Sequence, residues 1–236
     1  MSEWFPSEEW LDRYRANLNE SERYAAESDG WGVDFAGDFV FEIRSLPVEE
    51  TTVGEFPDDL TDDLRENLTS LPDERAATLV ADAPPTLRER LDEQEGDDRT
   101  RLLDALLATP VAEVPDAVSS ALREELPADL ANLLTQLERY VDDGTVRVYL
   151  DLYEGECREA FVLDPDDERD PGFALQGPYG SWKALTEGED VMDSVLGQDL
   201  DLDGSVTKIM SYADAADEMG DVASRTDSRA LFQGNA

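Results

Sequence analysis

The residues Asp199-Leu-Asp-Leu-Asp-Gly204 match the start of a calcium-binding loop, in which alternate carboxylates supply oxygen ligands. The last position of such a loop carries a bidentate glutamate, whereas this chain has Met210 there. A loop would also expose Leu200 and Leu202, while a β-strand would bury both on one face. We therefore interpret 199–203 as a strand, and the sequence predicts no metal and no cofactor.

Cys157 is the only cysteine in the sequence, so one chain can form neither an internal disulfide nor a multi-cysteine metal site. As a nucleophile this thiol would need a base or a nearby cation, and Arg158 is the one cation beside it in sequence. The chain contains no histidine, which excludes Ser-His-Asp and Cys-His catalysis, histidine-ligated zinc and histidine acid–base chemistry. We therefore interpret Cys157 as a small core residue.

Carboxylates are too abundant to mark a catalytic pair. The sequence has 58 Asp and Glu residues among 236, so almost any carboxylate has another near it by chance. The glycines show neither the G-x-G-x-x-G nor the Walker spacing of nucleotide-binding loops. The sequence thus predicts no catalytic residues, and we expect a protein that is not an enzyme.

The periodicity of apolar residues predicts the elements that position these side chains. Ser7 can cap an amphipathic helix over 7–28, whose apolar face includes Trp10, Leu11 and Tyr14. The elements expected after it are strands at 31–35 and 38–44, a hairpin over 145–163, a strand at 173–176, helices at 178–187 and 189–197, a strand at 199–203 and a helix over 205–224. Strands in one run, with helices after them, predict an α+β fold.

Residues 47–143 differ from the rest of the chain in amino-acid composition. Aromatic residues nearly vanish, leucine dominates and prolines recur. Leucines at helical spacing, such as Leu60, Leu64 and Leu68, predict four to six short helices that begin or end at prolines. We therefore expect an inserted helical module at 47–143. The rest is expected to form one α+β domain from 1–46 and 144–225, followed by a flexible C-terminal tail at 226–236.

The acidic excess is extreme, since 58 acidic and 19 basic residues give a net charge of −39. Such a surface repels itself in dilute buffer, whereas the Debye length falls to about 3 Å in molar salt. The composition therefore favours a salt-loving source such as a halophilic archaeon, and it argues against binding to nucleic acid or an anionic membrane surface. No apolar run approaches the roughly 18 residues of a membrane-spanning helix, and no export signal is visible. We therefore expect a cytoplasmic protein without stable membrane insertion.

A spaced set of glycine, aromatic and leucine positions marks residues 173–204. Its members are Gly177, Tyr179, Trp182, Leu185, Gly188, Glu189, Leu200, Leu202 and Gly204. With this set, the chain resembles the sterol carrier protein family of sterol-binding and lipid-transfer domains, in a halophilic archaeal form with a helical insertion. The resemblance covers about 1–45 and 144–225. One family glycine falls on Gln198, so we expect a bulge where the last strand begins.

The resemblance implies a twisted sheet of about five strands, with helices on one face and an apolar tunnel between the two layers. The expected ligand-lining residues are Trp182, Met192, Val195, Leu196, Ile209, Met210, Ala213, Phe39, Phe41, Phe161 and Leu175. It also implies non-catalytic binding or transport of a hydrophobic small molecule, such as a lipid, an isoprenoid, a quinone or an acyl thioester. The alternative is a ligand-free interaction protein whose 47–143 module docks a protein partner.

Overall fold

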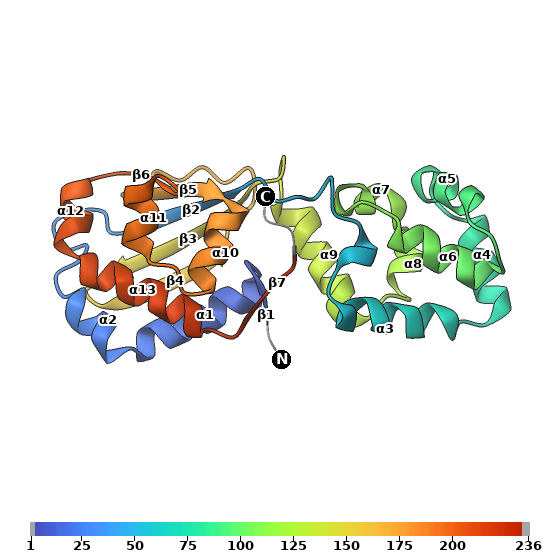
Figure 1. Cartoon of the computed structure of the whole chain (residues 1–236), viewed down its shortest axis with the longest axis horizontal. Helices are drawn as coiled ribbons and strands as arrows, with labels where there is room; N and C mark the ends of the chain where they lie inside the picture. The colour runs from blue at the N-terminus through green and yellow to red at the C-terminus, as the bar shows by residue number, and fades with distance from the viewer. Residues whose placement is uncertain (1–2, 233–236) are drawn as a thin grey trace. The chain divides into compact units, whose positions relative to one another are not determined.

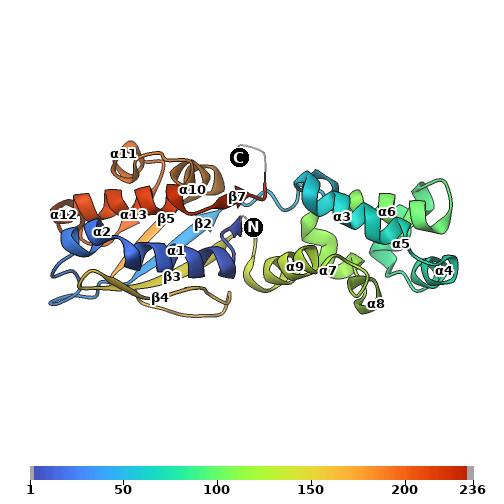
Figure 2. The same cartoon turned by 90° about the horizontal axis from the view of Figure 1, so that it is seen from below.

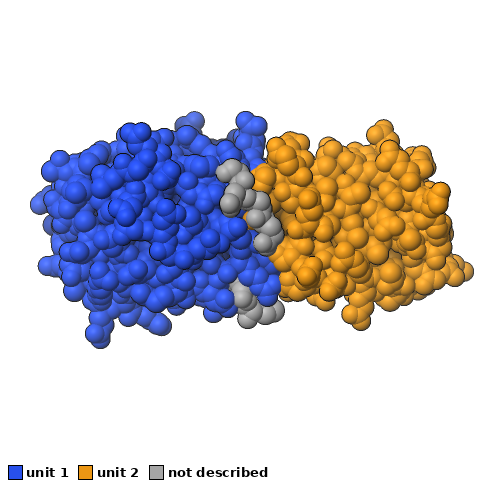
Figure 3. Space-filling view, viewed as in Figure 1, with its two compact units in different colours: residues 1–46, 139–230, 234–236 blue, residues 47–138, 231–233 orange. Residues whose placement is uncertain are grey.

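A computed structural model describes residues 3–232 of the chain. Its described residues form two compact units, coloured separately in Figure 3. Unit 1 consists of 3–46 and 139–230, and unit 2 consists of 47–138 with 231–232. The division of the chain into a lipid-binding domain and an inserted module stays a prediction.

Unit 1 is built on a mixed sheet of five strands in the order β4-β3-β2-β5-β6 (Figure 1). The central strand β2 pairs antiparallel with β3 and parallel with β5. The strands are β2 (Phe39–Arg44), β3 (Val146–Tyr153), β4 (Glu156–Val162), β5 (Phe173–Pro178) and β6 (Asp201–Asp203). The helices are α1 (Glu8–Glu20), α2 (Glu22–Glu27), α10 (Tyr179–Thr186), α11 (Val191–Gly197), α12 (Val206–Ser211) and α13 (Ala213–Arg225). The predicted α+β class with a five-stranded sheet is confirmed.

Alternation along the strands separates the two faces of the sheet. Phe39, Phe41 and Ile43 of β2 point to the face that the helices cover, a layer visible in Figure 2. Val40 points to the opposite face, where it clusters with Tyr149, Leu163 and Phe161. Arg169, from the acidic loop after β4, lies over the rings of Tyr149 and Phe161. The apolar core of unit 1 therefore lies between the sheet and its helices.

Each long helix expected in unit 1 is divided in two. Ser7 caps α1 as predicted, because its Oγ accepts from the Trp10 amide at 3.1 Å. Ser21 then ends α1 and caps α2, since its side chain accepts from the Tyr24 amide. At Tyr212 the backbone leaves the helical region, with φ −123°, and α12 gives way to α13. This second break rotates one helix face relative to the next.

The segment 31–35 forms turns and not the predicted strand. Gly30 and Gly32 adopt positive φ angles of 80° and 81°, which bend the chain on both sides of Trp31. The Trp31 indole N–H donates to the Gly37 carbonyl at 2.7 Å and closes the segment into a loop. Burial of one tryptophan has overridden the strand propensity of its neighbours.

The expectation of a flexible tail over 226–236 is wrong for its described part. Residues Ser228–Ala230 form β7, which pairs in parallel with β1 (Glu3–Phe5). Leu231 and Phe232, which belong to unit 2, are buried. The described part of this segment therefore contains a strand and buried residues, while 233–236 lie outside the described residues.

Unit 2 is all helical. Its described residues form seven α-helices, more than the four to six expected: α3 (Asp58–Thr69), α4 (Asp73–Ala81), α5 (Pro85–Glu93), α6 (Asp98–Leu107), α7 (Val114–Ala117), α8 (Ser120–Arg123) and α9 (Ala128–Tyr140), whose last two residues belong to unit 1. Two single-turn 3₁₀ helices cover Val53–Glu55 and Val111–Glu113. Pro57, Pro72 and Pro84 each stand just before a helix, as predicted. Among residues 3–232, no helix is long and apolar enough to cross a bilayer.

Candidate functional site

A cavity of about 90 Å³ lies in unit 1 between the sheet and the helical layer. The sheet contributes Phe39, Phe41, Ile43, Val148, Leu175 and Leu202, and β1 contributes Phe5. Helices α1, α10, α11, α12 and α13 contribute the remaining residues of the wall. These are Trp10, Leu11, Tyr14, Trp182, Leu185, Thr186, Val191, Met192, Val195, Ile209, Ala216, Met219, Gly220 and Ala223. Nearly all of these side chains are apolar, so the cavity offers an environment for hydrocarbon.

Most of the residues predicted to line a tunnel lie in this wall. They are Trp182, Met192, Val195, Ile209, Phe39, Phe41 and Leu175. Their contact with a ligand stays a prediction, because lying in the cavity wall does not by itself show that these residues bind one.

The other four predicted residues lie elsewhere. Leu196 is 67% exposed and Met210 is 50% exposed, because each follows an inward residue and so turns to the outer side of its helix. Phe161 packs with Tyr149 on the far face of the sheet. Ala213 falls outside the wall, since the break at Tyr212 makes it the first residue of α13.

The wall residues that were not predicted from the sequence include two groups on α1 and α13. Trp10, Leu11 and Tyr14 come from α1, whose apolar face was predicted but was not expected to line the cavity. Ala216 and Met219 come from α13 and occupy the face on which Ala213 was expected. The heptad-like spacing in both helices was the available signal.

A second, smaller cavity of about 30 Å³ adjoins the first. Phe39, Ile209, Ala216 and Met219 belong to both walls. The rest of its wall consists of Tyr24, Ser28, Trp31, Leu152, Tyr212 and Ala215. The two cavities therefore share part of their walls.

Polar groups in the wall of the larger cavity are few. The Thr186 hydroxyl donates to the Lys183 carbonyl at 2.8 Å. The Tyr14 hydroxyl donates to the Met219 carbonyl at 3.3 Å, and burial holds the pKa of Tyr14 well above its ordinary value, so it stays neutral. The indole N–H groups of Trp10 and Trp182 have no hydrogen-bond partner within the described residues.

Tight packing explains two glycines of the resemblance. A Cβ on Gly177 would lie 2.4 Å from Leu200, and one on Gly204 would lie 2.6 Å from the Phe173 ring. Glycine therefore lets β6 and its flanking residues approach β5. Gln198 adopts a left-handed φ of 67° at the end of α11, the region that favours glycine. The irregularity at this position ends a helix and is not the expected bulge in the strand.

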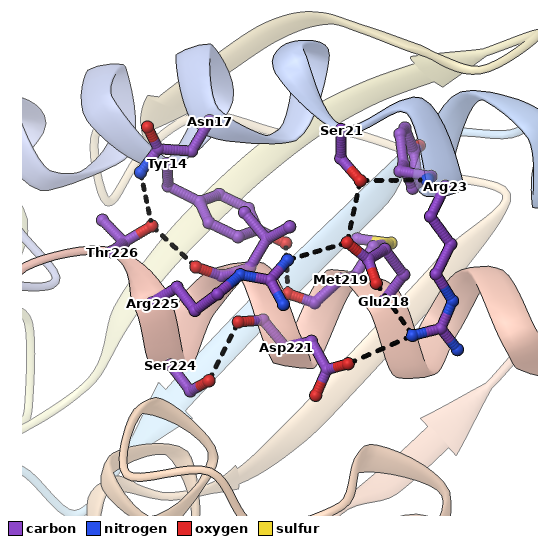
Figure 4. A network of polar contacts seen from close by, with 12 residues as sticks. Tyr14, Asn17, Ser21, Arg23, Glu218, Met219, Asp221, Ser224, Arg225 and Thr226 are labelled. Atoms are coloured by element: carbon purple, nitrogen blue, oxygen red, sulfur yellow. Dashed lines mark hydrogen bonds and ion pairs between the residues drawn. The ribbon is translucent and has the colours of Figure 1, made fainter.

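Helix α13 is held against α1 and α2 by a polar network around Glu218 (Figure 4). The buried Glu218 carboxylate accepts from the Ser21 hydroxyl at 2.8 Å, from Arg23 at 3.0 Å and from Arg225 at 2.7 Å. Burial alone would raise the pKa of Glu218, but the bonds from Ser21 and Arg225 outweigh it and lower the pKa. Because the opposite side of α13 forms the cavity wall, this network positions that wall.

The alternative chemistries considered from the sequence find no support in the geometry. Burial raises the pKa of the Cys157 thiol to about 12, so the group is a poor nucleophile at neutral pH. Asn19 holds the Cys157 backbone by accepting from its amide and donating to its carbonyl. Leu200 is buried and Leu202 lines the cavity, which fits a strand and not a calcium loop. Within residues 3–232, no group of three or more acidic, cysteine or histidine ligands could hold a metal ion.

Comparison with known proteins gives matches in structure alone. No protein-family model and no curated protein matches the chain. The chain is similar to a crystal structure of sterol carrier protein 2, at 17% identity and a TM-score of 0.47, with 93% of this chain and 97% of that chain covered. It is also similar to a solution structure of a conserved hypothetical protein, possibly sterol carrier protein, from Thermus thermophilus, at 18% identity and a TM-score of 0.47, with 98% of this chain and 92% of that chain covered.

Proposed function

We propose that unit 1 binds an apolar, chain-like molecule and carries it without catalysing a reaction. The observation that supports this proposal is the cavity between sheet and helices, whose wall is almost entirely hydrocarbon. Each methylene group transferred from water into such a wall contributes about 0.8 kcal/mol. Lipids, isoprenoids, quinones and acyl thioesters all have chains of this kind. The spacing of Tyr179, Trp182 and Leu185, which resembles that of sterol carrier proteins, supports the same function.

The size of the cavity implies that the wall must move when a ligand enters. Its volume of about 90 Å³ is smaller than the roughly 150 Å³ of a cavity that accommodates benzene. Helix α11 is the candidate lid. It contributes Val191, Met192 and Val195 to the wall, and it is only seven residues long. Outward movement of α11 would lengthen the cavity without breaking the sheet.

The 47–143 segment and the acidic surface belong to the same proposal. We infer that 47–143 is an inserted module that modulates access of the ligand or docks a protein partner. We also infer that the net charge of −39 adapts the protein to a cytoplasm rich in salt, where the repulsion between carboxylates is screened.

Organic extraction of protein purified in molar KCl, followed by mass spectrometry, tests the function. We expect a hydrophobic molecule in an amount comparable to that of the protein. After extraction and refolding, the emptied protein should bind the neutral dye Nile red, and the fluorescence of the dye should increase. Protein that contains no apolar molecule and takes up no dye would contradict the proposal, and a copurified protein would then favour a docking function.

A matched pair of variants locates the binding site. Ala216→Leu places three further carbon atoms in the wall shared by both cavities, at a cost of about 1–3 kcal/mol in stability. Ala213→Leu makes the same change on the same helix outside the wall. We expect the first variant to lose most dye uptake and the second to retain it. Equal uptake by two folded variants would remove this cavity as the site.

A further inference from the structure

We propose that the bound molecule carries an uncharged carbonyl group, as in an ester, a ketone or a quinone, which accepts hydrogen bonds from the indole N–H groups of Trp10 and Trp182. This inference rests on the proposed function and specifies its ligand. It assigns a polar recognition element to a cavity that is otherwise apolar.

The first observation is that two buried donors in one wall lack an acceptor. Trp10 is 4% exposed and Trp182 is 5% exposed, both line the cavity, and neither N–H has a partner within residues 3–232. Buried N–H groups in proteins are nearly always bonded. Trp31 follows that rule, since its buried indole donates to the Gly37 carbonyl at 2.7 Å. Two exceptions in the same wall indicate that a ligand supplies the acceptor.

The second observation is that both rings are held in place by other rings. Trp10 stacks on Tyr14 at 5.1 Å and meets the edge of Phe5 at 4.8 Å, measured between ring centroids. Trp182 packs against Phe41 at 5.0 Å. Rotation of either indole toward another protein acceptor would break these contacts. The donors are therefore fixed before a ligand arrives, which is the arrangement expected of a recognition group.

Charge decides which acceptor fits. The wall formed by the described residues contains neither lysine nor arginine, so a buried carboxylate would have no cation to compensate its loss of hydration. The net charge of −39 also repels an anionic ligand. A carbonyl oxygen avoids both penalties, and it brings no donor of its own that would need a partner. The wall therefore selects neutral carbonyl compounds over fatty acids and over pure hydrocarbons.

Indole N–H resonances report this contact directly. Protein labelled with ¹⁵N-tryptophan has four indole N–H signals, one for each Trp. In molar KCl, methyl decanoate should move the signals of Trp10 and Trp182 downfield, whereas n-dodecane, a chain of similar length without an acceptor, should not. Decanoate should bind more weakly than its methyl ester. The Trp→Phe variants described next assign each signal.

The same variants measure the contribution of each N–H. Trp10→Phe and Trp182→Phe remove a donor and keep an aromatic ring, so the preference for methyl decanoate over n-dodecane should fall by about 2- to 10-fold for each. Trp4→Phe is the control, because Trp4 lies outside the wall and its loss should leave the preference unchanged.

The outcomes separate this inference from the proposed function. If the ester and the alkane bind equally and move the indole signals alike, the carbonyl contact is refuted while the binding of an apolar chain stands. Tighter binding of decanoate than of its ester also refutes it. If none of the three probes binds, the proposed function fails as well.

Discussion

Replacing Glu218 with glutamine removes the charge of a buried carboxylate and keeps its shape. Glu218 is 3% exposed, and its two oxygens receive the Ser21 hydroxyl, Arg23 and Arg225. The bonds from Ser21, between α1 and α2, and from Arg23 of α2 join these elements to α13, while Arg225 lies on α13 itself (Figure 4). The substitution therefore tests what holds the helix that forms one wall of the cavity.

The size of the effect follows from the exposure of the partners. The bond from the half-buried Ser21 hydroxyl to the buried, charged carboxylate contributes about 1.5 kcal/mol. The side chains of Arg23 and Arg225 are 51% and 58% exposed, so each ion pair contributes only about 0.5 kcal/mol. Glutamine can keep part of one bond. We expect a loss of about 2 kcal/mol, equivalent to about 4–8 °C in Tm.

The sign of the pH dependence follows from the lowered pKa of Glu218. Burial opposes that shift, and the bonds from Ser21 and Arg225 produce it. A carboxyl whose folded pKa is depressed contributes stability above its unfolded pKa, which is about 4.3 for a free Glu. That contribution is lost as the pH falls through the folded pKa. The difference between wild type and Glu218→Gln should therefore be full at neutral pH and shrink in acid.

Thermal unfolding followed by circular dichroism in molar KCl measures both effects. Asp221→Asn is the matched control, because Asp221 lies on the same helix and pairs with Arg23 at 3.3 Å but is exposed. It should cost about 0.5 kcal/mol or less. If the two variants lose the same stability, or if the Glu218→Gln difference does not change with pH, the network does not hold α13 as argued.

Three further predictions concern the surface, the lid and the inserted segment. Dilution from molar KCl into low-salt buffer should unfold the protein in circular dichroism, because the net charge of −39 is then least screened; native structure in dilute buffer would contradict this. Gly220→Ala should speed the exchange of Nile red, measured by stopped-flow fluorescence, because the added Cβ would lie 2.6 Å from Val191 and push α11 outward. Unchanged exchange would show that α11 is not the lid. Deleting 48–142 with a Gly-Asn-Gly bridge should leave a folded domain, because the ends are already joined by the bond from the Leu46 amide to the Gly144 carbonyl at 2.8 Å. That variant should end at Ala230, since Leu231 and Phe232 belong to unit 2, and failure to fold in molar KCl would show that the segment supplies core.

Local sequence patterns were sufficient for the features that depend on local physics. Alternation in 145–153 predicted the strand β3, in which Val148 lies on the inner face of the sheet and Tyr149 on the outer face, because the side-chain period of a strand is two. The strand predicted at 199–203 is observed as β6 (Asp201–Asp203), where Leu202 faces the cavity, and Leu200 is buried just before it. The absence of histidine restricted the chemistry without any structure.

The tertiary structure decided which residues of each element reach the cavity. A single continuous helix over 205–224 would have kept Ile209, Ala213 and Ala216 on one face, but the break at Tyr212 leaves Ala213 outside the wall. The residues at 31–35 lost their strand to the burial of Trp31. The missing partners of Trp10 and Trp182 are likewise invisible in sequence, because hydrogen bonding between residues far apart depends on how whole elements pack and not on local propensity.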